Sequence, residues 1–179
     1  MLYTRKGDTG KTNIFGCGQR FSKSSAITEA LGSLDEANSY LGVIKCMVKG
    51  KKYKKDKITE IINNIQNNLF IIQAQVAGAD KKIVKNEVKK LERIIDSIEK
   101  DLPPIKTFVI SGVNELSANF DFVRTLARRA ERRVVAVSEE GIAEIDSETL
   151  VFLNRLSSLL YAFARYCAME SGVEKSPKY

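Results

Sequence analysis

Histidine is absent from this chain of 179 residues, and cysteine and proline occur only three times each. Without histidine, the chain excludes Ser-His-Asp and Cys-His catalysis, histidine general bases and imidazole metal ligands. The cysteines are dispersed at Cys17, Cys46 and Cys167, which fits reduced thiols in a cytoplasmic protein rather than a disulfide framework or a zinc site. No signal-peptide pattern and no run of about eighteen apolar residues occurs, so we expect a soluble protein without a membrane partner.

The composition fits one soluble domain covering residues 1–179. Hydrophobic residues make up 44% and charged residues 28% of the chain, which is ordinary for a globular protein long enough to bury a core. A net charge of +7 indicates an anionic partner, such as nucleic acid, nucleotide phosphates or an acidic surface. Part of this charge lies in the lysine-rich segment 49–57, which we interpret as a solvated loop. Any catalysis must come from positioning, cationic side chains, carboxylates or a cofactor.

Apolar residues recur at helical spacing in five stretches. Asp56 is a candidate cap for the second stretch, Gly78 ends it, and Pro103 and Pro104 end the third. Short connections between five helices predict an all-α, antiparallel five-helix bundle over residues 25–172, with a tail at 173–179. The expected helices cover about residues 26–48, 57–77, 86–102, 115–138 and 148–171.

The fourth expected helix carries five arginines and one glutamate within residues 124–133. Arg124, Arg128 and Arg132 are four residues apart and form one stripe, and Glu131 falls on the same side. Taken alone, such a stripe is typical of a solvated helix face. The alternative is a site where the guanidinium groups bind an anionic ligand. Arg129 and Arg133 lie off this stripe, so we expect them to be surface or subunit-contact charges.

Residues 1–24 differ from the rest because glycine, hydroxyl and cationic residues dominate, which disfavours a helix. Such a glycine-rich loop can present backbone amides and cations to phosphates, although it is not a Walker A sequence. On glycine content alone, a flexible N-terminal arm is the favoured interpretation.

Three further residues are candidates for the site. Asp35 lies beside the apolar face of the first helix, where a partly buried carboxylate needs a cationic partner from the arginine helix. Asn154 is an interhelical hydrogen-bonding residue or a ligand contact. Phe108, in the extended segment 106–112, is a core residue or the wall of a site for a flat ligand.

Three segments together resemble the PduO-type ATP:corrinoid adenosyltransferases. The first is residues 4–12, Thr-Arg-Lys-Gly-Asp-Thr-Gly-Lys-Thr, and the second is residues 128–132, Arg-Arg-Ala-Glu-Arg, preceded by Arg124. The third is residues 152–157, Phe-Leu-Asn-Arg-Leu-Ser, followed by Ala-Arg-Tyr at 164–166. Each is short, but their order, spacing and helical background make the combination specific. The similarity spans nearly the whole chain.

This resemblance implies a ferritin-like five-helix bundle that works as a homotrimer and binds ATP between two subunits. It implies transfer of the 5′-deoxyadenosyl group of ATP, with Mg²⁺, to the cobalt of a reduced corrinoid, cob(I)alamin, forming adenosylcobalamin and releasing triphosphate. Cob(I)alamin is itself a strong nucleophile, which suits a chain without histidine. A reductase and an adenosylcobalamin-dependent enzyme are implied partners. A nucleotide-dependent chaperone that delivers the cofactor, and a nucleic-acid-binding helical module without enzymatic activity, are the alternatives.

The resemblance also implies roles for particular residues. Arg128 and Arg132 would bind the phosphates, Arg124 would pair with Asp35 across the subunit interface, and Phe108 would form a wall of the corrin site. Glu131 and Asn154 would orient the nucleotide, and the metal would have no protein ligand set of its own. Seven residues of the N-terminal segment would also contact ATP, and they are Thr4, Arg5, Lys6, Gly7, Thr12, Asn13 and Lys23.

The chain departs from the family pattern at three positions on the expected corrinoid side. Where the family often reads Phe-Ile-Leu-Pro-Gly-Gly, residues 108–113 read Phe-Val-Ile-Ser-Gly-Val, so that Ser111 and Val113 differ. Ser158 stands where the family often has aspartate. These differences bear on corrinoid preference more than on ATP binding.

Overall fold

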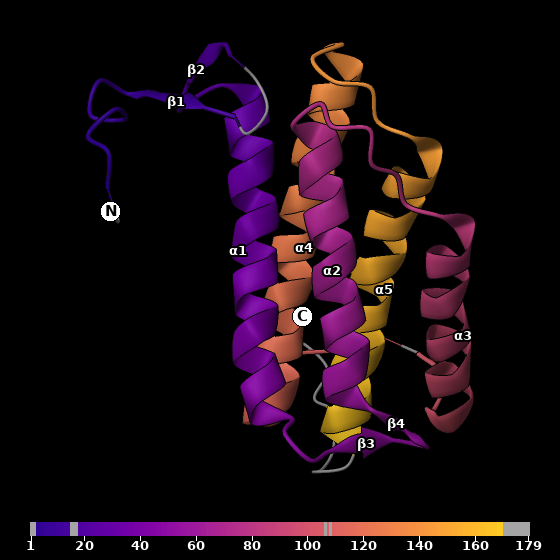
Figure 1. Ribbon diagram of the computed structural model, residues 1–179. Coiled ribbons are helices and arrows are strands. Elements are labelled where there is room, and N and C mark those ends of the chain that lie inside the picture. Colours follow the sequence, from indigo (N-terminus) through magenta and orange to yellow (C-terminus); the bar gives the residue numbers. More distant parts are fainter. Residues whose placement is uncertain (1–2, 15–17, 106, 108, 170–179) are drawn as a thin grey trace.

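The computed structural model describes residues 3–14, 18–105, 107 and 109–169. Within these residues five helices run side by side as a bundle (Figure 1), which confirms the predicted all-α fold. None of the described helices has both the length and the apolar composition needed to span a bilayer. The helices are α1 Ala26–Met47, α2 Ile58–Val76, α3 Lys85–Asp101, α4 Glu115–Glu139 and α5 Ser147–Met169.

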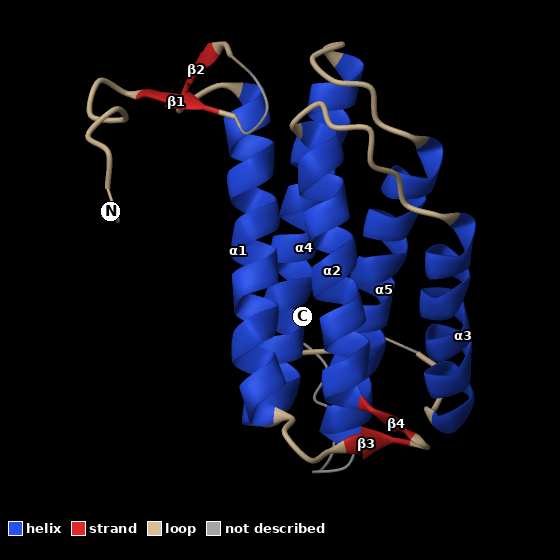
Figure 2. Ribbon diagram, in the orientation of Figure 1, coloured by secondary structure: helices blue, strands red, loops and turns tan. Residues whose placement is uncertain are grey.

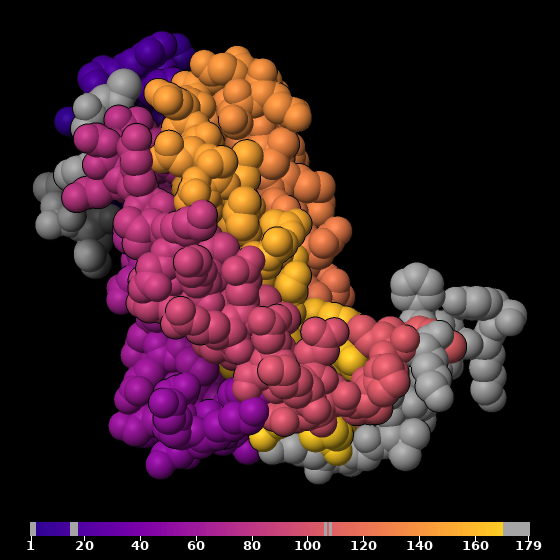
Figure 3. All heavy atoms as spheres, turned by 90° about the vertical axis from the view of Figure 1, so that its right-hand side faces the viewer, coloured from indigo at the N-terminus to yellow at the C-terminus, as the bar shows by residue number. Residues whose placement is uncertain are grey.

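The arginine-rich helix α4 lies between α1 and α5 and contacts both of them, while α3 packs on the outer side of α5. The space-filling view shows this order on one face, where α5 lies between α3 and α4 (Figure 3). The apolar stripes predicted from helical spacing meet in the core, where the Phe120 and Phe163 rings stack at 5.2 Å between centroids. This packing fixes which side of α4 remains available to a ligand.

The N-terminus of α4 is held by a capping box between Asn114 and Ser117. The Ser117 amide donates to Asn114 Oδ1 at 2.8 Å, and the Asn114 amide donates to Ser117 Oγ at 3.1 Å. Asn114 Nδ2 also donates to the backbone oxygen of Cys167 at 2.7 Å. The start of the arginine helix is thereby tied to the last turns of α5.

Two short hairpins stand at opposite ends of the bundle (Figure 2). The first pairs β1 Lys11–Asn13 with β2 Arg20–Ser22 and lies at the start of α1. The second pairs β3 Lys52–Tyr53 with β4 Asp56–Lys57 and leads into α2.

The interpretation of residues 49–57 as a simple solvated loop was wrong at Tyr53. Its ring is buried, packs edge-on against Tyr166 at 5.1 Å, and its hydroxyl donates to Asp101 Oδ2 at 2.9 Å. The surrounding lysines are solvated, but this one aromatic anchors the hairpin on α3 and α5. The predicted cap was also wrong, because Asp56 lies in β4 and Lys57 precedes the helix.

Candidate functional site

The arginines of α4 divide into two groups that face different neighbours. Arg129 forms an ion pair with Glu36 of α1, and Arg133 lies 3.9 Å from Glu29 of the same helix. These residues are therefore paired surface charges within the chain, as expected for positions off the stripe. Arg128 is exposed and, among the described residues, forms no ion pair.

The stripe itself borders a small cavity of about 300 Å³ between α4 and α5. Arg128, Arg132, Glu131 and Asn154 all line it. Asn154 Nδ2 donates to Glu131 Oε1 at 3.0 Å, and Arg132 Nη1 donates to the backbone oxygen of Arg128 at 3.1 Å. The structure thus brings together four predicted nucleotide-site residues, and among the described residues neither arginine is neutralised by a carboxylate.

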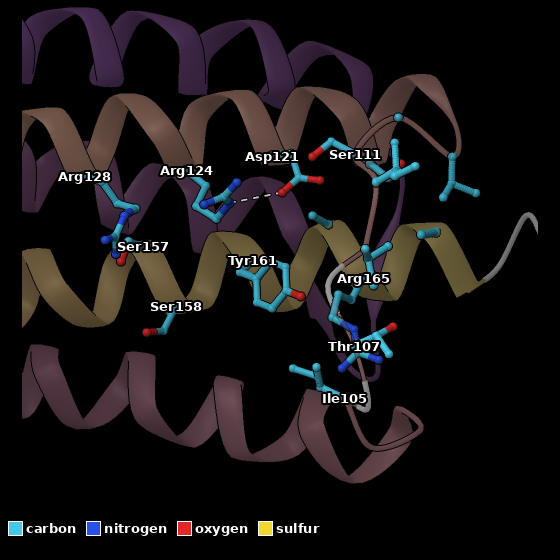
Figure 4. A pocket seen from close by; sticks show the side chains of 17 residues that line it. Ile105, Thr107, Ser111, Asp121, Arg124, Arg128, Ser157, Ser158, Tyr161 and Arg165 are labelled. Atoms are coloured by element: carbon cyan, nitrogen blue, oxygen red, sulfur yellow. Dashed lines mark hydrogen bonds and ion pairs between the residues drawn. The ribbon is translucent and has the colours of Figure 1, made fainter. Parts of the chain in front are cut away.

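A larger cavity of about 750 Å³ adjoins the first along α4 and α5 (Figure 4). Its volume lies within the range of sites for sizeable ligands. Arg124 and Arg128 project from α4 toward α5 here (Figure 4). Arg124 Nε donates to Asp121 Oδ1 at 3.0 Å, and the Arg124 guanidinium lies 5.7 Å from the centre of the Tyr161 ring. Arg128 lines both cavities, so it stands where they meet.

The far wall of this larger cavity is the segment between α3 and α4. Arg165 of α5 is only 7% exposed and its Nη2 donates to the backbone oxygen of Pro103 at 3.0 Å, which fixes the start of the segment. Ser111, Val113 and Ser158, the three departures from the family pattern, all line the cavity. Phe108, predicted to form a wall of the corrin site, lies outside the described residues.

The N-terminal segment forms a loop closed by the first hairpin. Arg20 donates to the backbone oxygens of Lys6 and, at 3.2 Å, Lys11. The Lys23 amide donates to the oxygen of Gly10 at 2.9 Å. A Cβ placed on Gly7 would lie 3.1 Å from Lys23 Nζ, so this ammonium sits directly against the loop. Lys23 therefore joins Arg5 and Lys6 as a cation of the same segment.

Asp35 occupies a different place from the one expected. It is exposed rather than partly buried, because its position on α1 faces away from the core, and it lines a cavity of about 540 Å³ together with Thr12, Asn13 and Phe70. Arg124, its predicted partner, pairs with Asp121 of its own helix. The predicted pair between Asp35 and Arg124 would join two subunits, so it stays a prediction.

Sequence reasoning missed Asp121 and Arg20. Asp121 lies three residues before Arg124 on a helix, and that spacing is a usable signal for an ion pair. Arg20 holds the loop through backbone oxygens that only the hairpin register brings near it, so no sequence pattern indicates its role.

Among the described residues, the N-terminal loop and the arginine stripe line separate cavities. The cavity beside Asp35 includes Thr12 and Asn13 but no arginine, whereas the cavity beside Asn154 includes Arg128 and Arg132 but no residue of the loop. In Figure 1 the first hairpin extends from the start of α1, on the side away from α5.

Within the described part of the chain, no group of three or more histidine, cysteine, aspartate or glutamate side chains is placed to hold a metal ion.

The fold and the site define an all-α protein with a stripe of arginines beside a cavity of about 750 Å³. The family model for cobalamin adenosyltransferase matches residues 2–167, and the chain belongs to that family.

Individual relatives agree with this assignment. The chain is 37% identical to a corrinoid adenosyltransferase PduO of Citrobacter freundii, over 92% of this chain and 49% of the relative. It is 35% identical to a corrinoid adenosyltransferase of Bacillus subtilis, over 96% of this chain and 89% of the relative. The chain spans about half the length of the PduO relatives that it matches.

A solved structure gives the same result for the fold. A variant of the PduO-type ATP:corrinoid adenosyltransferase from Lactobacillus reuteri, complexed with cobalamin and ATP, superposes with a TM-score of 0.87. The sequence identity is 28%, and the alignment covers 99% of this chain and 97% of the other.

Proposed function

We propose that this protein transfers the 5′-deoxyadenosyl group of ATP to the cobalt of a reduced corrinoid, forming adenosylcobalamin and triphosphate. The observation that carries the proposal is the position of Arg128, an arginine with no ion pair among the described residues, at the junction of a small cavity and a larger one. The small cavity suits the phosphates of ATP and the larger one suits a corrinoid. Membership of the cobalamin adenosyltransferase family supports both assignments.

The chemistry needs no nucleophilic side chain. The Co(I) centre donates an electron pair to C5′ and forms the Co–C bond, while the C5′–O bond breaks and leaves its electron pair on the triphosphate. The protein has to align C5′ with cobalt and stabilise the departing negative charge. Arg128 and Arg132 supply that stabilisation, and Mg²⁺ carried on the phosphates supplies more. A chain without histidine is sufficient for this reaction.

ATP binds between two subunits of a homotrimer in this proposal. Because the N-terminal loop and the arginine stripe lie apart in one chain, one triphosphate reaches both only if a second copy supplies one of them. The loop contributes Thr4, Gly7 and the neighbouring cations, and the partner copy contributes the stripe. The same contact brings Asp35 of one copy to Arg124 of another. Glu131 and Asn154 orient the nucleotide.

The corrinoid occupies the larger cavity, with Phe108 at its wall. Ser111, Val113 and Ser158 line this cavity, so corrinoid preference is decided here. A reductase that supplies the electron for Co(II), and an enzyme that uses adenosylcobalamin, are the proposed partners. We place the protein in the cytoplasm, where the exposed Cys46 thiol, which forms no disulfide, stays reduced.

The test is Co–C bond formation from MgATP and chemically reduced cobalamin, followed by the absorbance change of the corrinoid. The expected result is an ATP-dependent conversion that stops when ATP is omitted. No conversion under fully reducing conditions would overturn the proposal.

The shared site is tested by mixing two impaired variants. Lys6→Ala damages the loop and Arg128→Ala damages the stripe, so each homotrimer loses most of its activity. In mixed trimers some junctions combine an intact loop with an intact stripe, and part of the activity returns. A mass three times the 20.0 kDa chain by light scattering is expected. Absence of any recovery after subunit exchange would contradict a shared site.

Nucleic-acid binding by the basic helix is less well supported. Of the five arginines, Arg129 and Arg133 are balanced by α1 carboxylates, which leaves a short stripe inside a groove rather than a broad basic surface.

A further inference from the structure

A chain of four side chains connects α3 to the arginine stripe through α5. Arg155 Nε donates to Glu92 Oε1 at 3.0 Å, and Arg155 Nη1 donates to Asn154 Oδ1 at 2.9 Å. Asn154 Nδ2 then donates to Glu131 Oε1 at 3.0 Å. Glu92 and Arg155 line neither the small cavity nor the larger one, so they would not touch the ligands directly.

The two neighbours of Asn154 determine how its amide is turned. An amide has an acceptor side and a donor side, and a half-turn about the last bond exchanges them. Arg155 can only donate and ionised Glu131 can only accept. Held between these two groups, Asn154 keeps Oδ1 toward Arg155 and Nδ2 toward Glu131. The second N–H of Nδ2 and the second lone pair of Oδ1 remain for a ligand in the small cavity.

Among the described residues, the Glu131 carboxylate accepts a hydrogen bond from Asn154 and forms no ion pair with Arg128. Glu131 lies three residues after Arg128, a spacing at which helical side chains of opposite charge attract each other. Here its carboxylate accepts from Asn154 instead, and within the described residues Arg128 has no carboxylate partner. An unpaired guanidinium is the form that binds phosphate oxygens.

We propose that Arg155 and Glu92 are positioning residues of the nucleotide site. Glu92 holds the Arg155 guanidinium, Arg155 fixes the amide of Asn154, and Asn154 draws Glu131 away from Arg128. This inference rests on the proposed function for the identity of the ligand, ATP. Without Arg155 the amide turns freely, Glu131 approaches Arg128, and the site loses affinity for the triphosphate.

The first test is MgATP binding by calorimetry, with KM values measured in parallel. Arg155→Met keeps the length of the side chain and removes both donors. We expect Kd and KM for ATP to rise about 5- to 10-fold, the size of one or two lost hydrogen bonds, with KM for cobalamin and Tm nearly unchanged. Arg93→Met is the control. Arg93 is an exposed residue of α3 that lines neither cavity, so this variant should leave ATP binding unchanged.

Two further variants separate positioning from a general structural role. Glu92→Gln keeps an acceptor for Arg155 and should retain most of the ATP affinity, whereas Glu92→Met should approach Arg155→Met. In an Asn154→Ala background the effect of Arg155→Met should disappear, because Arg155 acts only through that amide. A purely structural contribution would instead add to the effect of Asn154→Ala.

The outcomes distinguish this inference from the proposed function. Wild-type protein that binds ATP without forming a Co–C bond would overturn the proposed activity but leave the binding test intact. Unchanged ATP affinity in Arg155→Met, or additive effects in the double variant, would overturn the positioning role alone. Failure of the wild-type protein to bind ATP would overturn both.

Discussion

Replacing Arg128 by alanine should impair ATP use far more than replacing Arg133 by alanine, although both are exposed arginines of one helix. Arg128 lines both cavities and, among the described residues, has no ion pair. Its loss therefore removes a contact to the triphosphate and breaks no ion pair. A hydrogen bond to a charged group contributes about 1.5–3 kcal/mol. If that contribution is made in the transition state, kcat/KM for ATP falls about 10- to 150-fold.

The control variant removes the same chemical group from the opposite face. Arg133 lies 3.9 Å from Glu29, and the two side chains are 52% and 50% exposed, so this pair contributes at most about 1 kcal/mol to stability. Arg133→Ala should change kcat/KM less than about 2-fold, since the pair touches neither cavity. Steady-state kinetics at saturating reduced cobalamin measure both variants. Equal losses in the two variants would refute the assignment of the stripe to the triphosphate.

Two further predictions concern the frame of the site. The hydrogen bond from the Tyr53 hydroxyl, and to a lesser extent Lys54, lowers the pKa of Asp101. The stabilisation by the ionised Asp101 carboxylate is therefore complete above about pH 4, and it is lost as the pH falls through the lowered pKa. Tyr53→Phe should therefore reduce Tm most near neutral pH, and the difference from wild type should shrink in thermal scans below about pH 4; a difference that grows in acid would contradict this. Thr149→Val should lower the free energy of unfolding by about 1–3 kcal/mol in urea titrations. Thr149 Oγ1 donates to Gln75 Oε1 at 2.7 Å inside the core, and valine leaves that acceptor without its donor. An unchanged free energy of unfolding would show that the contact contributes nothing.

The helices could be predicted because each buries a stripe that repeats at the helical period. In α4 the predicted core residues Val123, Ala127, Ala130 and Val134 are all buried, since no other arrangement hides them together. Helix ends depend on a few local contacts, and they were predicted less well. The cap at Asp56 failed because β4 uses that residue for backbone pairing with Tyr53.

The hairpin of residues 52–57 was missed because its stability comes from distant residues. Six lysines within residues 49–57 favour a solvated loop, whereas the single aromatic, Tyr53, packs on residues of α3 and α5 that lie far away in sequence. Long-range contacts of this kind leave no periodic signal. An aromatic residue isolated in a lysine-rich segment was the one available indication.

The sequence predicted only part of the division of the α4 arginines into two groups. Spacing on α4 distinguishes Arg128 and Arg132 from Arg129 and Arg133, because neighbouring positions differ by about 100° around a helix. It does not say which pair faces a ligand, since either face of an isolated helix could be solvated. That decision comes from α1, whose Glu29 and Glu36 lie opposite Arg133 and Arg129. Ion pairs on the α1 side of the helix neutralise Arg129 and Arg133. On the side that faces α5, the Glu131 carboxylate accepts a hydrogen bond from Asn154. The cationic character of the stripe is therefore a property of three helices, although all of its arginines come from one.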